Sequence, residues 1–183
     1  MPGKEKSRSQ RITEEDQALM LKALSWDGIT TPETSRHYVA WAFLFALETA
    51  MRQGEILAMK RQDIKEGFVH LQMTKNGESR NVPLSKEAKR LLSLLPKTNN
   101  QLLPIDKDQC CATWVRAKKR AGLPHINFHD SRHEAITRMV KVRKLPVEVL
   151  AKITGHKTIS MLVNTYYNPD AQDLVEMFND SES

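Results

Sequence analysis

The stretch FHDSRHEAITRM, residues 128–139, gathers side chains of the kinds that bind metals or phosphates. His129, Asp130 and His133 could ligate a metal ion, whereas Arg132 could hold an anion. On a helix, His129 and Arg132 would share the face that carries the later apolar residues of the stretch. Asp130 would lie about 100° away from His129. This phase favours an inward arginine that meets an anion or a carboxylate, because a buried guanidinium is costly without one.

A second arginine has the same relation to an apolar face. In MRQGEILAM, Arg52 would share a helical face with Ile56 and Met59, and Glu55 is close enough in sequence to pair with it. One inward arginine usually forms a salt bridge. Two such arginines, each at the start of an apolar stripe, indicate a clamp for a shared anion, since the planar guanidinium matches phosphate oxygens.

Four further residues could take part in the same chemistry, and each also has an ordinary structural interpretation. Lys75 precedes an Asn-Gly turn, where a hairpin tip could bring a proton donor into a groove or simply carry a solvated lysine. His156 follows a glycine at a helix break, as an anion ligand or as a capping or surface histidine. Tyr166 and Tyr167 end a helical stretch, where partly buried core aromatics are also common.

These residues would be positioned by a mainly α-helical domain with a small antiparallel β-sheet (α+β). The segment YVAWAFLFAL is apolar on every face, which is typical of a helix buried in the middle of a domain. The Asn-Gly turn within 67–84 predicts two short strands. Thr13 is the expected N-cap of the first helix, with Asp16 as its capping-box partner. Helices are predicted over about 13–24, 33–50, 51–64, 85–95, 108–121, 130–142, 146–154 and 158–166, followed by an amphipathic segment, AQDLVEMF.

The composition is that of one globular domain, with 183 residues, 40% hydrophobic and 27% charged. A formal net charge of +6 is compatible with a polyanionic partner. The two cysteines are adjacent, so no disulfide framework is expected. The N-terminus lacks an apolar signal sequence, and the longest apolar run is far short of the roughly 20 residues that span a bilayer. We therefore expect a soluble, cytoplasmic protein without membrane association.

Five motifs follow one another along the chain: MRQGE, the hairpin TKNGESRNVPL, HDSRH, TGHKTISM and NTYYNP. Each is weak alone, but their order and spacing resemble the catalytic domain of the tyrosine recombinases, also called the phage integrase family. The resemblance covers residues 12–168. It implies that residues 1–11 are a basic leader or interdomain linker, and that residues 169–183 are a tail that could be exchanged between subunits.

For the phosphate and the nucleophile, the resemblance implies roles for four residues. Arg52 and Arg132 would hold the non-bridging oxygens of the scissile DNA phosphate. Tyr166 would attack phosphorus, giving a 3′-phosphotyrosine and a free 5′-hydroxyl. His156 would hydrogen-bond the phosphate.

For proton transfer, the resemblance implies that Lys75 protonates the leaving 5′ oxygen and that His129 is a base or proton relay near the tyrosine. Glu55 would support the site. No metal and no other cofactor is expected, because two guanidiniums supply the positive charge.

The chain departs from the family pattern at two places within the motifs. Ser131 replaces the leucine that is common in the second motif. The common spacing from the last histidine to the nucleophile falls on Thr165, and members with an Asn-Thr-Tyr ending use the next residue, which here is Tyr166.

The expected partner is double-stranded DNA, bound by a homotetramer that is monomeric when free. Basic groups at Arg116, Lys118, Lys119 and Arg120, and at Arg138, Lys141, Arg143 and Lys144, could line the DNA backbone or simply form solvated helix faces. The expected activity is site-specific recombination and integration. Alternatives are type IB topoisomerase-like relaxation, a catalytically inactive DNA-binding module, and a metal-dependent phosphohydrolase built on His129, Asp130 and His133.

Overall fold

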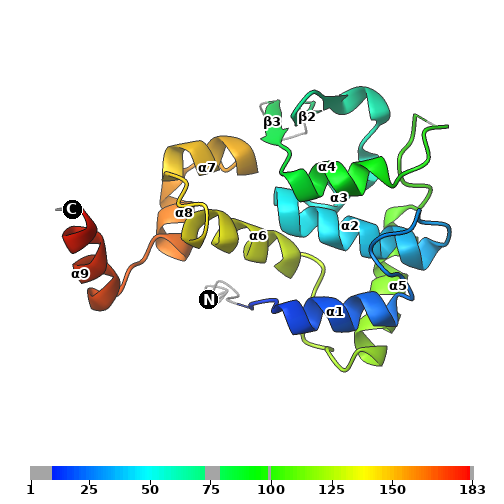
Figure 1. The fold of residues 1–183 in the computed structure, drawn as a ribbon, viewed down its shortest axis with the longest axis horizontal. Helices are drawn as coiled ribbons and strands as arrows, with labels where there is room; N and C mark the ends of the chain where they lie inside the picture. The colour runs from blue at the N-terminus through cyan, green and yellow to red at the C-terminus, as the bar shows by residue number, and fades with distance from the viewer. Residues whose placement is uncertain (1–9, 73–78, 99, 182–183) are drawn as a thin grey trace, which may run out of the picture.

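The computed structural model describes residues 10–72, 79–98 and 100–181. It confirms a mainly helical domain with a small antiparallel sheet (Figure 1). The helices are α1 (Glu14–Ala23), α2 (Ser35–Thr49), α3 (Gln53–Ala58), α4 (Lys86–Ser93), α5 (Lys107–Arg120), α6 (Asp130–Lys141), α7 (Val147–Thr154), α8 (Ile159–Tyr166) and α9 (Ala171–Asp180).

Helix α2 is the centre of the core, as its uniformly apolar sequence predicted. Its residues from Tyr38 to Leu47 are all buried, and it packs against α3, α4, α5 and α6. Trp41 stacks on Phe45 with ring centroids 4.7 Å apart, and its Nε1 donates to the Leu91 carbonyl oxygen at 2.7 Å. Because neighbouring helices contact it on several sides, α2 fixes where their ends lie.

The sheet has the order β1-β2-β3, with β1 at Ile64–Lys65, β2 at Phe68–Leu71 and β3 at Arg80–Pro83. The two expected strands are β2 and β3, paired antiparallel from Phe68↔Pro83 to Leu71↔Arg80. Strand β1 was not expected. The predicted Asn-Gly turn and Lys75 lie outside the described residues.

The predicted helix over 51–64 is divided into several pieces. After α3, Met59 is extended with ψ 133°, and a short 3₁₀ helix follows at Arg61–Asp63. The Asp63 carboxylate accepts the Lys60 N–H at 2.8 Å, which caps this new turn. The prediction of a single helix was therefore wrong, because the chain is extended at Met59 and a separately capped 3₁₀ helix begins after it.

Helices α6, α7 and α8 form the part of the domain that leads to α9, which stands apart at the edge of Figure 1. All residues of α9 are exposed. No helix in the described ranges is both long enough and apolar enough to cross a membrane.

Candidate active site

Arg132, in the first turn of α6, is a buried guanidinium that joins two helix ends. It is 3% exposed, and it donates from Nη1 to the Ala50 carbonyl oxygen at 2.6 Å and from Nη2 to the Thr154 carbonyl oxygen at 2.9 Å. Ala50 is the C-cap of α2, and Thr154 is the last residue of α7. Burial, and then the charges of Arg52 and Arg80, lower the pKa of Arg132 to about 10. The predicted inward position of Arg132 is confirmed, and main-chain carbonyl oxygens meet it.

Arg52 does not take the inward position that its spacing predicted. It is the N-cap of α3, with an extended backbone at ψ 150°, and its side chain is 48% exposed. The helical spacing rule fails here because Arg52 lies before the first helical residue. Its Nη1 lies 3.8 Å from Glu55 Oε1, which is a loose contact. Its charge nevertheless reaches Arg132, whose pKa it lowers.

Arg80, at the start of β3, is a site residue that the sequence analysis missed. Its Nη1 and Nη2 donate to the Glu55 carboxylate at 2.6 and 2.8 Å, and its Nε donates to the Ile153 carbonyl oxygen at 2.9 Å. Burial raises the pKa of Glu55, but the hydrogen bonds from Arg80 and the Arg52 N–H outweigh it and leave that pKa below its ordinary value. Gly155, at φ +77°, lies so close that a Cβ there would be 3.1 Å from the Arg80 side chain. Arg80 thereby ties α3, β3 and α7 together.

The predicted phase of α6 is wrong for its first two positions. His129 is the N-cap and is exposed although its backbone is helical, whereas Asp130 is 2% exposed, so the buried face of α6 includes Asp130 rather than His129. The His129 ring lies edge-on to that of His133, with centroids 4.9 Å apart. Although His129 is exposed, the surrounding protein partly desolvates its ring and lowers its pKa, and the charges of His133 and Arg132 act in the same direction.

His156 follows α7, and Thr154 orients its ring. The His156 Nδ1 lies 2.6 Å from Thr154 Oγ1, and the same hydroxyl donates to the Leu150 carbonyl oxygen at 3.0 Å. Because the hydroxyl proton is used on Leu150, Nδ1 carries a hydrogen and Nε2 is left to face a ligand. Burial, and then the charge of Arg132 and two further arginines, lower the pKa of His156 to about 4. The ring is therefore neutral at pH 7.

The two adjacent tyrosines have different partners. Tyr166, the half-buried last residue of α8, places its hydroxyl 2.5 Å from His133 Nδ1. Burial raises the pKa of Tyr166 to about 12, although the charge of Arg132 opposes this. The Tyr167 hydroxyl donates instead to the Leu145 carbonyl oxygen. Tyr166 therefore faces the charged residues, and Tyr167 is held against the segment between α6 and α7.

The structure brings most of the predicted site residues into one electrostatic cluster. Their charges act on one another across α3, α6, the segment after α7, and α8. Lys75 lies outside the described residues. The residues brought together are Arg52, His129, Arg132, His156 and Tyr166 and the expected supporting residue Glu55, with Arg80 and His133 added by the structure.

The metal-site hypothesis has no geometric support in the described residues. Asp130 is turned into the domain, where its Oδ2 accepts the Asn127 N–H at 2.8 Å. Its carboxylate is thus not directed at a metal beside the rings of His129 and His133. Across residues 10–72, 79–98 and 100–181, no group of three His, Cys, Asp or Glu side chains could hold a metal ion.

Glu134 ties the segment before α1 to the helix that carries Arg132. It is 2% exposed, and its carboxylate accepts from Arg11 Nε at 2.7 Å, the Ile12 N–H at 3.2 Å and Arg138 Nε at 3.1 Å. Burial raises the pKa of Glu134, but these hydrogen bonds outweigh it and lower the pKa overall. Arg11, expected in the leader, thus contacts α6.

Several members of the two predicted basic groups form bonds within the domain. Lys118 donates to Asn127 Oδ1 at 3.3 Å and Arg120 to the Ala23 carbonyl oxygen at 2.9 Å. Such bonds hold the side chains against the domain. The exposed members are Arg116, Lys119, Arg120, Lys141, Arg143 and Lys144.

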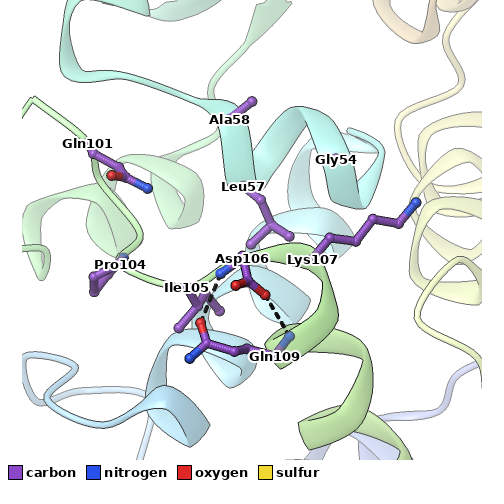
Figure 2. Close-up of a pocket in the computed structure, with 9 residues that line it drawn as sticks. All are labelled: Gly54, Leu57, Ala58, Gln101, Pro104, Ile105, Asp106, Lys107 and Gln109. Carbon is purple, nitrogen blue, oxygen red and sulfur yellow. Dashed lines mark hydrogen bonds between the residues drawn. The ribbon is translucent and has the colours of Figure 1, made fainter.

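A shallow hollow lies elsewhere, between α3 and the start of α5 (Figure 2). Its lining includes Gly54, Leu57 and Ile105, together with the capping pair Asp106 and Gln109. The Asp106 carboxylate accepts the Gln109 N–H at 2.8 Å. These two polar side chains of the hollow therefore cap the N-terminus of α5. None of the predicted site residues lines this hollow.

Comparison with solved structures defines the class of the fold. The chain is similar to the catalytic domain of bacteriophage HP1 integrase, with a TM-score of 0.67, 21% identity, and coverage of 92% of this chain and 94% of that one. It is also similar to the Tn1549 transposon integrase solved with transposon right end DNA, with a TM-score of 0.72, 15% identity, and coverage of 99% and 68%. The fold is that of tyrosine recombinase catalytic domains.

The sequence comparisons identify the family. The model of the phage integrase family matches residues 10–173, and the chain therefore belongs to this family. It is 39% identical over 184 residues to a candidate integrase/recombinase of Haemophilus influenzae, covering 98% of this chain and 59% of that protein. It is 42% identical over 123 residues to the shufflon-specific DNA recombinase of Escherichia coli, covering 66% and 32%. The chain thus spans only part of the length of these relatives.

Proposed function

We propose that the chain is the catalytic part of a site-specific DNA recombinase or integrase, which cleaves and rejoins strands through a 3′-phosphotyrosine. The observation that carries this proposal is the position of Tyr166 within reach of the charge of the buried Arg132, to which Arg52 and Arg80 add positive charge and Glu55 adds negative charge. Burial is the first cause of the low pKa values of Arg132 and His156, and the positive charges of the neighbouring arginines lower both values further. An anionic phosphodiester is the ligand that such a site favours.

The reaction would be a displacement at phosphorus. Arg132 and Arg52 hold the non-bridging oxygens and stabilise the charge that develops on them. His156 donates from Nε2 to the phosphate once the ring is protonated. The Tyr166 oxygen forms a bond to phosphorus while the bond to the 5′ oxygen breaks. Lys75 protonates that oxygen, and His129 supports proton transfer near the tyrosine.

The partner would be double-stranded DNA in the cytoplasm, and neither a metal nor another cofactor enters the proposed steps. The protein would assemble as a homotetramer on DNA and be a monomer when free. Helix α9 supports assembly, because it leaves the domain with Leu174 and Phe178 54% and 70% exposed. We assign α9 as the segment that docks on a neighbouring subunit, which favours strand exchange over relaxation by a topoisomerase-like monomer.

A label-transfer experiment tests the chemistry. The protein is incubated at low salt in EDTA with nicked duplexes whose central region is randomised and whose cleaved strand is labelled at its 5′ end. A nick just downstream of the cleaved bond lets the short product leave and traps the adduct. The expected result is a labelled protein band in denaturing gels, which is present in Tyr167→Phe and absent in Tyr166→Phe.

Other outcomes point elsewhere. A band lost only in Tyr167→Phe contradicts the choice of nucleophile. Cleavage without an adduct, abolished by EDTA, indicates a metal-dependent phosphohydrolase. DNA binding without cleavage under all conditions indicates an inactive binding module.

A further inference from the structure

His133 occupies a position beside the reacting hydroxyl that the family-based roles do not include. It follows Arg132 on α6, but it is only partly buried and its ring faces α8. Its Nδ1 lies 2.5 Å from Tyr166 Oη, with the two rings inclined by 30° and their centroids 6.3 Å apart. The contact joins the helix that holds Arg132 to the helix that ends in the proposed nucleophile.

The chemistry at Tyr166 requires a proton acceptor at this distance. Burial raises the pKa of this phenol to about 12, so only about one molecule in 10⁵ is ionised at pH 7. A base in direct hydrogen-bond contact can remove the proton as the oxygen attacks. Among the described residues, His133 is the base found in such contact with Tyr166.

His129, which the resemblance assigns to this task, lies one ring further away. It is exposed at the start of α6, and its ring contacts the His133 ring at an interplanar angle of 89°. Such an edge contact restrains the orientation of the His133 imidazole. His129 therefore suits a positioning role for His133.

We propose that His133 is the residue that accepts the phenolic proton of Tyr166, through Nδ1, and that His129 positions it. This inference rests on the proposed recombinase function. The O–H bond of Tyr166 breaks and its proton moves to Nδ1, while the oxygen electron pair forms the bond to phosphorus. The bond from phosphorus to the 5′ oxygen breaks, and the proposed general acid protonates that oxygen. The neutral His133 ring must then carry its hydrogen on Nε2.

Kinetics of single-turnover adduct formation test this role. At pH 7, His133→Asn, which keeps a polar group near the Nδ1 position but is not a base, should slow adduct formation by about 10²- to 10⁴-fold. The loss should shrink as pH rises. It should also shrink when Tyr166 is replaced by 3,5-difluorotyrosine, whose phenol ionises more readily. A purely structural role would give the same loss at each pH and with each phenol.

The groups that face His133 enter the pH profile and need their own controls. They are His129 at the N-cap of the same helix, Tyr166 on α8, and His156 and Arg132, whose charges couple to this cluster. His129→Asn serves as the matched variant. If His129→Asn shows the sensitivity to pH and fluorination and His133→Asn does not, the assignment of His133 is overturned.

A measurement on the unaltered protein tests the inference without depending on whether a variant folds. Nitrogen NMR of the His133 ring should show Nδ1 without hydrogen and Nε2 with it while the ring is neutral. The opposite tautomer overturns the inference. If the unaltered protein forms no adduct with any duplex, the proposed function fails as well. Adduct formation at full rate in His133→Asn overturns the role of His133 alone.

Discussion

The protonation state of His156 should depend on whether a phosphate is bound between the neighbouring guanidinium groups. Without DNA, burial and the surrounding arginines hold the pKa of His156 at about 4, and Nδ1–H is engaged with Thr154. A phosphate held by Arg132 and Arg52 would place negative charge close to the ring. The imidazolium would then be favoured, and Nε2–H could donate to the phosphate.

We therefore predict that DNA binding raises the pKa of His156 well above 4. Since the bound state then takes up a proton that the DNA-free state lacks, DNA affinity should increase as pH falls through the raised pKa towards about 4, the value in the DNA-free protein. Carbon and proton NMR titration of His156, with and without DNA, measures the shift. His156→Gln should lose this part of the pH dependence. An unchanged pKa on binding would place His156 away from the phosphate.

For single residues, the sequence predicted which residues belong to the candidate site better than it predicted which side chains are buried. The order of motifs singled out Arg132, His156 and Tyr166, which lie in one cluster. The inward positions of Arg52 and His129 were wrong: Arg52 precedes its helix with an extended backbone, and the buried face of α6 begins at Asp130 rather than at His129. Capping geometry depends on the chain before the helix, which periodicity does not describe.

At the scale of elements, the pair of Arg80 and Glu55 holds the parts of the site in register. It joins β3 to α3, and the further bond from Arg80 to the Ile153 carbonyl oxygen adds α7. The exposed fractions of the two side chains are only 11% and 9%. The pair is therefore poorly screened by solvent, unlike an ordinary surface salt bridge.

Arg80→Gln should lower the free energy of unfolding by about 3–5 kcal/mol, because it leaves the buried Glu55 carboxylate without its main partner. Urea denaturation measures the change. The double variant Arg80→Gln and Glu55→Gln should recover part of the loss, since no unpaired charge remains. A cost below about 1 kcal/mol for Arg80→Gln, as in exposed pairs, would contradict this account.

The elements themselves were predictable where caps and periodicity agreed. Thr13 and Asp16 form the expected capping box of α1, and Ser85 caps α4 at the expected place. Strand β1 and the 3₁₀ turn before it were missed because two or three residues carry no periodic signal. Arg80 was missed because its partners are distant in sequence and only the folded domain brings them together.

For the whole molecule, α9 is the element whose apolar side chains the domain does not cover. Leu174, Val175, Met177 and Phe178 are all more than half exposed. Exposed apolar groups on a helix that stands apart favour burial against another molecule. In the proposed tetramer, each α9 would contact a neighbouring subunit.

Replacing Leu174 and Phe178 by Asp should weaken assembly of several subunits on DNA at least about tenfold, since loss of an anchoring apolar side chain commonly costs more than about 1 kcal/mol. Cleavage of a single site by one subunit should persist. Mass photometry of the DNA complexes measures assembly. Gln172→Asp with Asn179→Asp, which adds the same charge to α9, is the matched control. Equal assembly by both double variants would argue against docking through the apolar side chains.

The two carbonyl bonds of Arg132 also give the site a handedness. Because Ala50 and Thr154 hold the guanidinium in place, its remaining N–H groups point in fixed directions, and we expect them to favour one of the two prochiral oxygens of a bound phosphodiester. Rp and Sp phosphorothioate substrates should therefore be cleaved at rates that differ by about tenfold, the worth of one charged hydrogen bond. Arg132→Lys should reduce this stereoselectivity. Equal rates for both diastereomers in the unaltered protein would mean that the clamped guanidinium does not select between the oxygens.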